Sequence, residues 1–279
     1  MNRKYCLVTG ATHGIGTETA RALAVAGAHV LVHGRDLARA RGVAEALRRD
    51  SGNPEVHAVQ ADFARLADIR RLGQELCATL PRLDVLINNA GMMSATRATS
   101  ADGYDLTFAV NHLAPFLLTN LLLGKLKECA PARIVVVASD AHRRATLDFD
   151  DLMNTKVAGL LPAYARSKLA NVLFVRALAR RLADSAVTVN ALHPGFVSSH
   201  LFHDHAARVL LGAFGRPFML TPAAGARTSI YLATSPQVEG MSGGYYARCR
   251  PVAPSAASQS DVDAERLWQA SARLTGLSA

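Results

Sequence analysis

The chain has 279 residues, with 31 Lys and Arg against 22 Asp and Glu, so its formal net charge is +9. Half of the residues are hydrophobic, which excludes disorder for most of the chain. Four cysteines without a Cys-x-x-Cys pair exclude a disulfide scaffold and a structural zinc ribbon. The positive charge leaves open a nucleic acid, an anionic ligand or no specific partner.

The sequence gives no sign of a targeting or membrane segment. Two positive charges at the N-terminus precede a strand-like run that is too short for a signal-peptide core. The longest apolar run, Leu113–Leu123, is interrupted by polar residues and falls short of the roughly 20 residues that span a bilayer. We therefore expect a soluble, cytoplasmic protein without a membrane anchor.

Apolar runs of strand length alternate with longer runs of helical periodicity. The expected strands are Tyr5–Thr9, His29–His33, Val56–Gln60, Val85–Asn88, Arg133–Ala138, Val187–His193 and Gly244–Tyr246. The expected helices are Ile15–Ala26, a helix capped by Asp36 that ends near Asp50, Leu66–Leu80, Asp102–Glu128, Pro162–Ala183 and Pro222–Thr234. Continuous β-branched runs are typical of strands buried on both faces. The pattern predicts an α/β fold, a doubly wound parallel sheet of about seven strands with helices on both faces, in a single domain over residues 1–279.

A glycine-rich turn joins the first expected strand to the first expected helix. Gly10 allows the tight turn, Gly14 lets the backbone approach a pyrophosphate, and Gly16 lets helix and strand pack closely. The N-terminus of the helix offers free N–H groups and a partial positive charge to phosphates. Because the spacing is Gly-x-x-x-Gly-x-Gly and not Gly-x-Gly-x-x-Gly, a turn without a ligand remains an alternative. The candidate cofactor contacts here are Gly10, Thr12, His13, Gly14, Ile15 and Gly16.

The residues after the second expected strand indicate which dinucleotide binds. An NAD site usually places an acidic residue there for the ribose 2′-hydroxyl, and an NADP site places an arginine for the 2′-phosphate. Here Arg35 follows the strand, and Asp36 has the position of a helix cap. NADP(H) is therefore favoured over NAD(H), and a solvated surface arginine is the alternative interpretation of Arg35.

Tyr164 and Lys168 are four residues apart, so on a helix they lie on the same face. A tyrosine ordinarily ionises near pH 10, and a cation within about 4–6 Å favours its charged form. Such a tyrosine can exchange a proton with a carbonyl or alcohol oxygen near neutral pH. The same spacing also occurs by chance in ordinary surface pairs.

Five motifs in chain order resemble the short-chain dehydrogenase/reductase family, whose members have a Rossmann-like fold. They are Thr9–Gly16, Asn88-Asn89-Ala90-Gly91, Ser139 after the fifth strand, Tyr164-x-x-x-Lys168, and Asn190 followed by Pro194-Gly195. The resemblance covers about residues 4–247. Further segments are similar to the retinol-dehydrogenase and WW-domain-oxidoreductase branch. These are Asn111-His112-Leu113, Ala138–His142, Ser167–Asn171, Leu192–Gly195, and Leu267-Trp268 with Leu274–Gly276 in the tail.

The resemblance implies a role for each matching residue. Tyr164 would be the general acid or base, and Lys168 would lower its pKa and bind the ribose. Ser139 would orient the substrate oxygen, and Asn111 would hold a water of a proton relay. Asp62 would contact the adenine. The further cofactor contacts would be Asn88, Asn89, Ala90, Gly91, Pro194, Gly195, Val197 and Ser199, together with Tyr164 and Lys168.

Two features depart from the common family pattern. Ser139 and Tyr164 are 25 positions apart, wider than usual in the family, although the retinol-dehydrogenase branch has a longer segment there. Ser167 is the competing hydroxyl, and we expect it to point away from the substrate. Relatives in that branch often carry a membrane anchor before the first strand, whereas this chain starts at that strand, so the expectation is a soluble enzyme.

An apolar segment, residues 198–220, is expected to cover the substrate, and residues 248–279 form a C-terminal extension. A small apolar carbonyl or alcohol, such as a retinoid-like, steroid-like or polycyclic molecule, would fit such a lid. The alternative is that these side chains only pack the lid onto the body. His193, His200, His203 and His205 cluster nearby, but the ligand spacing is poor and we expect no metal site.

The Arg doublets are scattered over separate segments, so no nucleic-acid groove is expected. The leading hypothesis is an NADP(H)-dependent carbonyl reductase or alcohol dehydrogenase. The alternatives are a ketoreductase that tailors a polyketide or antibiotic side chain and a non-catalytic, dinucleotide-sensing regulator. The expected helices Asp102–Glu128 and Pro162–Ala183 resemble those of the family's dimer interface, which suggests a homodimer or homotetramer.

Overall fold

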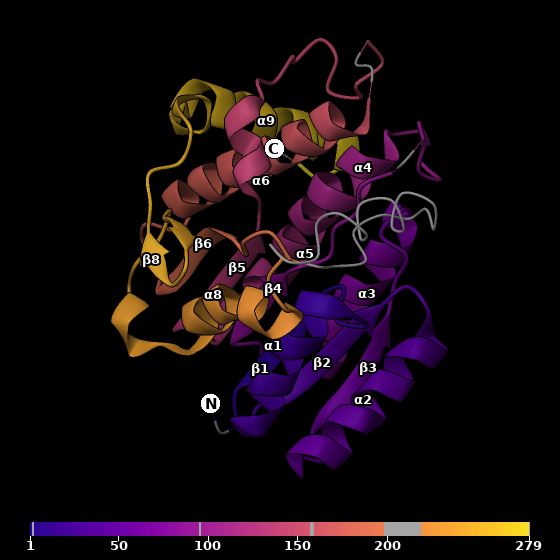
Figure 1. Cartoon of the computed structure of the whole chain (residues 1–279), viewed down its shortest axis with the longest axis vertical. Helices are drawn as coiled ribbons and strands as arrows, with labels where there is room; N and C mark the ends of the chain where they lie inside the picture. Colours follow the sequence, from indigo (N-terminus) through magenta and orange to yellow (C-terminus); the bar gives the residue numbers. More distant parts are fainter. Residues whose placement is uncertain (2, 95, 157–158, 198–218, 279) are drawn as a thin grey trace.

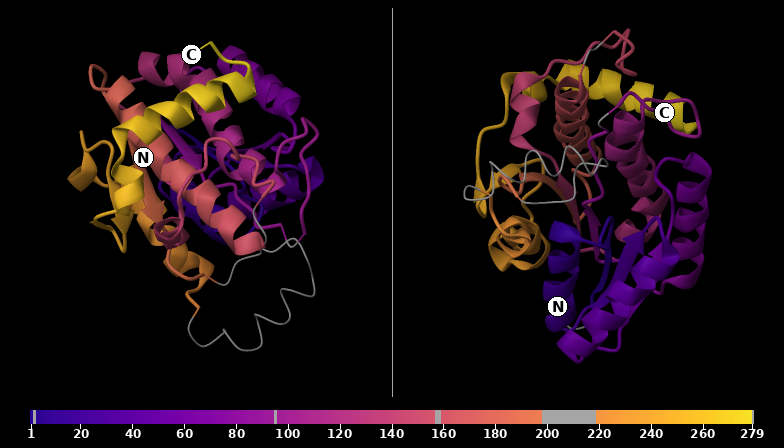
Figure 2. Two further views of the ribbon diagram at one scale, coloured as in Figure 1. Left: turned by 90° about the horizontal axis from the view of Figure 1, so that it is seen from above. Right: turned by 45° about the vertical axis from the view of Figure 1, so that its right-hand side comes forward.

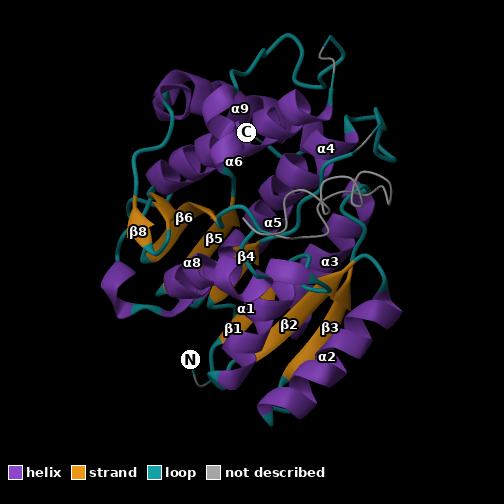
Figure 3. Ribbon diagram, viewed as in Figure 1, coloured by secondary structure: helices purple, strands orange, loops and turns teal. Residues whose placement is uncertain are grey.

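A single twisted sheet forms the centre of the molecule, and helices cover both of its faces (Figures 1 and 3). The computed structural model describes residues 1, 3–94, 96–156, 159–197 and 219–278. In this part of the chain the sheet has eight strands in the order β3-β2-β1-β4-β5-β6-β7-β8. The predicted α/β, doubly wound fold is confirmed, with one strand more than expected.

The strands agree closely with the predicted ranges. They are β1 (Tyr5–Val8), β2 (His29–Gly34), β3 (Val56–Gln60), β4 (Val85–Asn88), β5 (Ala132–Val137), β6 (Val187–His193), β7 (Tyr245–Ala247) and β8 (Arg250–Pro251). Neighbouring strands from β3 to β7 are parallel, and β8 is antiparallel to β7. Because β8 has two exposed residues and no apolar run, its sequence carried no strand signal.

Successive side chains of β1 point to opposite faces of the sheet and so belong to different cores. Leu7 packs into the larger core, whereas Cys6 and Val8 pack into the smaller one. The smaller core is covered by α1 (Gly14–Val25), α2 (Leu37–Ser51) and α8 (Pro222–Thr234). The larger core is covered by α3 (Leu66–Thr79), α5 (Ala114–Glu128), α6 (Leu160–Arg181) and α9 (Asp261–Thr275). Both faces are thus sealed, which explains the uninterrupted apolar character of the strands.

The helix expected over Asp102–Glu128 begins later and is irregular. Asp105 caps a short α4 (Leu106–Phe108), which continues through a π-helical segment η1 (Ala109–Leu113) into α5. A π-helical turn inside an α-helix often occurs at a functional site. The segment Leu106–Glu128 has a mean hydropathy of 1.5 and is apolar enough to cross a membrane, but 72% of its most apolar window is buried within the protein.

The C-terminal helix α9 packs along α6, beside α5 (Figure 2). Asp261 of α9 pairs with Arg176 at 2.6 Å, and Glu265 pairs with Arg181 at 2.8 Å. The Arg181 guanidinium lies 4.0 Å from the centroid of the Trp268 ring. The predicted C-terminal extension is therefore an integral part of the larger core in this structure.

The strand order changes direction between β1 and β4, since β2 follows on one side and β5 on the other. Open parallel sheets bind ligands at the carboxyl ends of the strands at such a position. The turn after β1 and the segments after β4 and β5 meet here, so the fold brings the sequence motifs together.

Candidate active site

The glycine-rich turn between β1 and α1 is tightly packed. Gly10 and Gly14 both have φ of 60°, a conformation that favours glycine. A Cβ on Gly16 would lie 2.4 Å from the carbonyl oxygen of Gly10 and 2.5 Å from Asn89 Nδ2. His13 occupies the N-cap of α1 but makes no side-chain cap hydrogen bond. The turn therefore keeps the N-terminus of α1 close to the sheet, as a phosphate-binding turn requires.

The ends of β1 and β4 are joined beneath this turn. The Thr9 hydroxyl accepts hydrogen bonds from the amides of Asn89 and Ala90 at 2.9 and 3.0 Å. Asn89 Nδ2 donates to the carbonyls of Thr9 and Gly10 at 2.8 and 3.1 Å. Asn88 Nδ2 instead donates to Thr119 Oγ1 at 2.9 Å, inside the larger core. Asn89 therefore holds the turn in place through its hydrogen bonds, and Asn88 holds the end of β4 against the larger core.

His33, a residue of β2, also belongs to this region, although its sequence pattern indicates only a strand position. Its Nδ1 accepts from the Gly10 amide at 3.2 Å, and its Nε2 lies 3.1 Å from the carbonyl oxygen of Ala61. Because a carbonyl only accepts, the proton is on Nε2 and the ring is neutral. Burial lowers the pKa of His33 to about 4, which agrees with a neutral ring. The signal in the sequence that could have indicated these bonds is a histidine at the end of an otherwise apolar strand.

Arg35 follows β2 next to the glycine-rich turn. A Cβ on Gly34 would lie 2.5 Å from Thr12 Cγ2, so the end of β2 touches the turn. Gln60 Nε2 donates to the Arg35 carbonyl at 3.1 Å, and Arg71 holds Gln60 through bonds of 2.7 and 2.9 Å. The expectation that Asp36 caps α2 is confirmed, since it accepts from the Arg39 amide at 3.1 Å.

Asp62, the predicted adenine contact, follows β3 on the same side of the sheet. Its Oδ1 accepts from the amide of Ala64 at 3.0 Å, and its own amide donates to Asp68 at 3.0 Å. These bonds fix the turn between β3 and α3. The adenine contact itself stays a prediction.

Tyr164 and Lys168 lie together on α6, and Ser139 follows β5. Lys168 Nζ is 5.5 Å from the centroid of the Tyr164 ring and donates to the Val137 carbonyl at 3.0 Å. Burial lowers the pKa of Lys168 to about 8. Burial raises the pKa of Tyr164 to about 12, and a hydrogen bond with Ser139 acts in the opposite direction. The structure therefore unites three of the four predicted catalytic side chains, Ser139, Tyr164 and Lys168, across a sequence separation of 29 residues.

Asn111 lies in the π-helical segment and is fully buried. Its Oδ1 accepts from the Met92 amide at 2.8 Å, while its Nδ2 donates to the Met92 carbonyl and to Ser167 Oγ, both at 2.9 Å. Ser167 in turn donates to the carbonyl of Tyr164 at 2.7 Å, so its hydroxyl is engaged within the protein, and its direction relative to the substrate stays a prediction. Asn111 thus joins the segment after β4 to α6, and its role in a water relay stays a prediction.

Gly91 lies close to the predicted catalytic side chains. A Cβ at this position would lie 3.2 Å from Lys168 Nζ and 3.4 Å from Asn111 Oδ1. A larger residue at this position would therefore crowd the lysine and the asparagine. The N-terminus of α1 and the buried ammonium of Lys168 are groups that suit the phosphates and the ribose of a dinucleotide.

The segment after β6 lies against the opposite side of the turn. Gly195 has φ of 91°, and Val197 forms a bridge with Leu220. A Cβ on Gly225 would approach Val197 to 2.5 Å and Ile15 to 3.2 Å, so Val197 is next to the start of α1. Ser199, three of the clustered histidines and all of the expected lid except Met219 and Leu220 lie outside the described residues.

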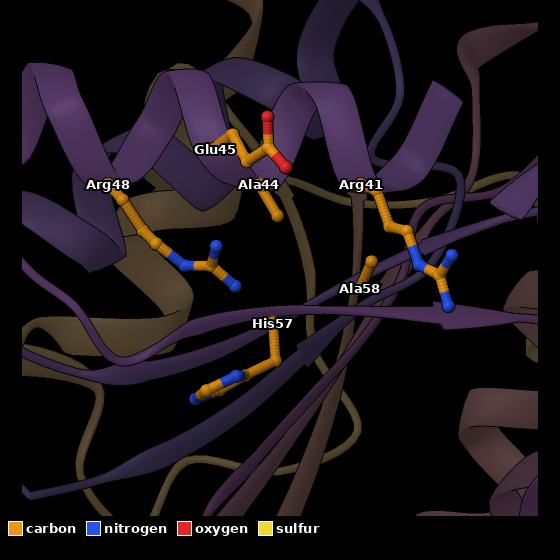
Figure 4. Close-up of a pocket in the computed structure, with 6 residues that line it drawn as sticks. All are labelled: Arg41, Ala44, Glu45, Arg48, His57 and Ala58. Atoms are coloured by element: carbon orange, nitrogen blue, oxygen red, sulfur yellow. The ribbon is translucent and has the colours of Figure 1, made fainter. Parts of the chain in front are cut away.

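His193, the described member of the clustered histidines, ends β6 and faces Asp140, whose amide donates to His193 Nδ1 at 3.2 Å. In the described ranges, no group of three or more His, Cys, Asp or Glu side chains is arranged to hold a metal ion. A recess of about 350 Å³ lies elsewhere, between α2 and the edge strand β3 (Figure 4). Its walls carry Arg41, Arg48 and His57, and none of the catalytic side chains reaches it.

The family model described as short chain dehydrogenase matches residues 4–209. The chain belongs to the short-chain dehydrogenase family, and it is therefore an oxidoreductase with an NAD(P)-binding type of fold. The expectation of an enzyme is confirmed at this level.

Two human relatives illustrate the similarity in sequence. The chain is 43% identical to retinol dehydrogenase 14 of Homo sapiens, over 99% of this chain and 88% of that protein. It is 45% identical to dehydrogenase/reductase SDR family member 13 of Homo sapiens, over 98% of this chain and 74% of that protein. The predicted similarity to the retinol-dehydrogenase branch is confirmed.

Solved structures share this fold. An uncharacterized protein from Mycobacterium paratuberculosis has a TM-score of 0.81 and 30% identity, covering 99% of this chain and 94% of that chain. A short-chain dehydrogenase from Escherichia coli CFT073 in complex with NADPH has a TM-score of 0.70 and 26% identity, covering 88% of this chain and 96% of that chain.

Proposed function

We propose that this protein is an NADP(H)-dependent oxidoreductase that transfers hydride between nicotinamide and the carbonyl or alcohol carbon of an apolar substrate. The observation that carries the proposal is the convergence of Ser139, Tyr164 and Lys168 beside the phosphate turn. Neither motif alone would suffice, because a glycine-rich turn or a Tyr-x-x-x-Lys pair can occur without a ligand. The bound nicotinamide would supply or accept the hydride.

Tyr164 exchanges the proton in this mechanism. Its buried hydroxyl is neutral at ordinary pH, since its pKa is raised to about 12, so it can donate a proton to a carbonyl oxygen that gains negative charge. Lys168 places a positive charge beside the ring, which stabilises the tyrosinate that remains. In the direction of alcohol oxidation the same pair takes up the proton.

Ser139 orients the reacting oxygen. Its Oγ accepts from the Ala141 amide at 3.2 Å, which leaves its O–H free to donate toward Tyr164 or toward the substrate oxygen. A donor that is already oriented stabilises the developing charge without reorganisation. Asn111 maintains the cluster by holding the Met92 backbone against Ser167 on α6.

The preference for NADP(H) rests on Arg35, which follows β2 where a 2′-phosphate would lie. Gln60 bonds the Arg35 carbonyl and is itself held by Arg71, so the backbone of Arg35 has a fixed position. The Escherichia coli relative in complex with NADPH is consistent with this preference.

An apolar substrate is supported by the surroundings of the site. Leu161 and Phe196 are 65% and 60% exposed, and Leu220 is 41% exposed. Leu161 lies at the start of α6, Phe196 precedes the expected lid, and Leu220 is the last residue of that lid. The names of the related retinol dehydrogenases point to the same chemical class. A cytoplasmic location and a homo-oligomer stay predictions.

The test is NADPH and NADH oxidation with a panel of retinal, a steroid ketone, a polyketide ketone and a short polar aldehyde. We expect turnover with NADPH and an apolar carbonyl, and Tyr164→Phe should lower kcat by about a thousandfold. The matched control is Tyr231→Phe, because that hydroxyl bonds only Gln237 at the surface of α8 among the partners described. Undiminished turnover by Tyr164→Phe would contradict the mechanism.

A further inference from the structure

His142 lies in the short 3₁₀ turn η2 (Asp140–Arg144) that follows Ser139, and its side chain is fully buried. Its Nδ1 is 2.7 Å from the carbonyl oxygen of Ser139. Its Nε2 accepts a hydrogen bond of 3.0 Å from the backbone amide of Ser255, which is 113 positions further along the chain. One imidazole ring thus connects the active-site serine to the C-terminal part of the protein.

The two partners determine the protonation of this ring. A carbonyl oxygen only accepts and a backbone amide only donates, so the proton is on Nδ1 and the lone pair is on Nε2. A second proton, on Nε2, would face the Ser255 N–H and break that bond. Burial lowers the pKa of His142, in agreement with a neutral ring.

We propose that His142 is a positioning residue that fixes the hydroxyl of Ser139, and that the Ser255 amide holds its ring in the required tautomer. The inference rests on the proposed function, since it explains how the hydroxyl of Ser139 is oriented in the active site. His142 acts through Ser139 and is not itself a proton donor to the substrate.

The path from the ring to the hydroxyl is short. The Ser139 carbonyl accepts from His142 Nδ1 and from the His142 amide, the latter at 3.1 Å. These bonds fix the peptide plane after Ser139 and so the position of the next amides. The Ala141 amide donates to Ser139 Oγ at 3.2 Å. The orientation of the hydroxyl therefore depends on a turn that the imidazole holds at its first carbonyl.

Other groups surround the ring without contacting the Ser139 carbonyl. Tyr245 of β7 packs edge-on at 4.8 Å between ring centroids and donates to Asp140 at 3.1 Å. Asp140 raises and Arg143 and His193 lower the pKa of the ring. These charges oppose one another in sign, whereas burial is the largest effect and favours the neutral form.

The segment that provides Ser255 is a part of the chain outside the five sequence motifs. It runs from β8 at the edge of the sheet toward α9 (Figure 1). Ser255 precedes the 3₁₀ turn η5 (Ala256–Gln259), and its hydroxyl contacts Ser258 at 3.3 Å. The correct tautomer of His142 thus requires the C-terminal extension in its packed position.

Three variants of the NADPH-bound enzyme separate positioning from general stability. His142→Phe removes both ring bonds and keeps the volume, so kcat should fall at least about tenfold while the KM for NADPH stays unchanged. His142→Asn keeps a donor near the Nδ1 position and should recover most of kcat. The control is Arg143→Met, because Arg143 also links this turn to the C-terminal segment, at Ala253, but does not contact Ser139.

A double-mutant cycle identifies the residue through which His142 acts. In a Ser139→Ala background, His142→Phe should change kcat less than about twofold, since the hydroxyl to be aimed is absent. Equal effects in both backgrounds would contradict the proposal. So would a loss of kcat in Arg143→Met as large as in His142→Phe.

A measurement without turnover keeps this inference separate from the proposed function. Nitrogen NMR of the NADPH-bound wild type should show His142 protonated on Nδ1 and unprotonated on Nε2. Amide hydrogen exchange at Ala141 should be at least about tenfold faster in His142→Phe than in wild type or His142→Asn. Unchanged exchange, or the opposite tautomer, would overturn the inference even if the enzyme reduces the whole panel. If wild type reduces no substrate, the proposed function fails and these data still decide the inference.

Discussion

The glycine-rich turn after β1 and the cluster of predicted catalytic residues lie at the same edge of the sheet, but they are built in different ways. The turn is made of eight consecutive residues, Thr9–Gly16, whose glycines leave room for backbone and ligand. The cluster combines Asn111, Ser139, Tyr164 and Lys168 from three separate segments, held by side-chain bonds and by helices packed behind them. In the proposed function, dinucleotide binding depends on the absence of side chains in the turn, whereas proton transfer depends on long-range packing.

The largest expected effect concerns the packing behind the cluster. Trp268 of α9 is buried against Phe116 at 5.0 Å and Phe174 at 6.0 Å between ring centroids. Trp268→Ala should lower the free energy of unfolding by about 4 kcal/mol, because it leaves a cavity in the larger core. Urea unfolding measures this loss. The control is Val262→Ala, at a position of the same helix that is 68% exposed, and its free energy of unfolding should stay close to that of the wild type.

The second effect is a dependence of stability on pH that arises at the turn. The pKa of His33 is about 4 in the folded chain, whereas an unperturbed histidine, as in the unfolded chain, has a pKa of 6.5. Between these two pH values the unfolded chain therefore binds a proton that the folded chain does not. Stability therefore falls as the pH falls through this window, by about 3 kcal/mol from this residue. Urea unfolding at several pH values should show that the free energy of unfolding decreases less with falling pH in His33→Gln than in the wild type. The exposed His57→Gln should behave like wild type, and equal decreases in all three proteins would contradict the assignment.

The third effect isolates the turn itself. Gly16→Ala places a methyl group 2.4 Å from the Gly10 carbonyl, so the turn must open and the Kd of NADPH should rise about a hundredfold. The control is Gly42→Ala in α2, where an added Cβ meets nothing within 4 Å. That variant should bind NADPH normally and be slightly more stable, since alanine is the better helix former. Fluorescence titration with NADPH measures both variants.

The smallest effect concerns the choice of dinucleotide. Arg35→Ala should raise the KM for NADPH about tenfold, because a charge-assisted bond to the 2′-phosphate is lost, and leave the KM for NADH nearly unchanged. Arg49→Ala, in the last turn of α2, is the control for a general change of charge. A rise of equal size for both dinucleotides would show that Arg35 does not distinguish them.

The same contrast explains what the sequence could predict. The strands β1 to β7, the glycine turn and the Asp36 cap have local signals, so they were predicted within one or two residues, whereas β8 has no such signal. The Tyr164 and Lys168 pair was also local, because helical spacing places both on one face. Their convergence with Ser139 followed from the order of parallel strands and from the family resemblance.

Other features depend on partners that are distant in the sequence. The π-helical segment at Asn111, the bonds of His33 to Gly10 and Ala61, and the bond of Ser255 to His142 join segments between 19 and 113 positions apart. Periodicity reports which face of a helix is buried, but not which polar groups meet inside. The helix expected over Asp102–Glu128 begins four residues later for a local reason, because Asp105 and not Asp102 caps it through the Phe108 amide.

The most direct test of the separation between binding and chemistry is one experiment on wild type, Tyr164→Phe and Gly16→Ala. It measures the Kd of NADPH and the single-turnover rate constant of hydride transfer to an apolar carbonyl at saturating NADPH. Tyr164→Phe should keep the Kd within about twofold and lower the rate constant about a thousandfold. Gly16→Ala should raise the Kd about a hundredfold and keep most of the rate constant once NADPH is bound. A Tyr164→Phe enzyme that transfers hydride at the wild-type rate would contradict the account.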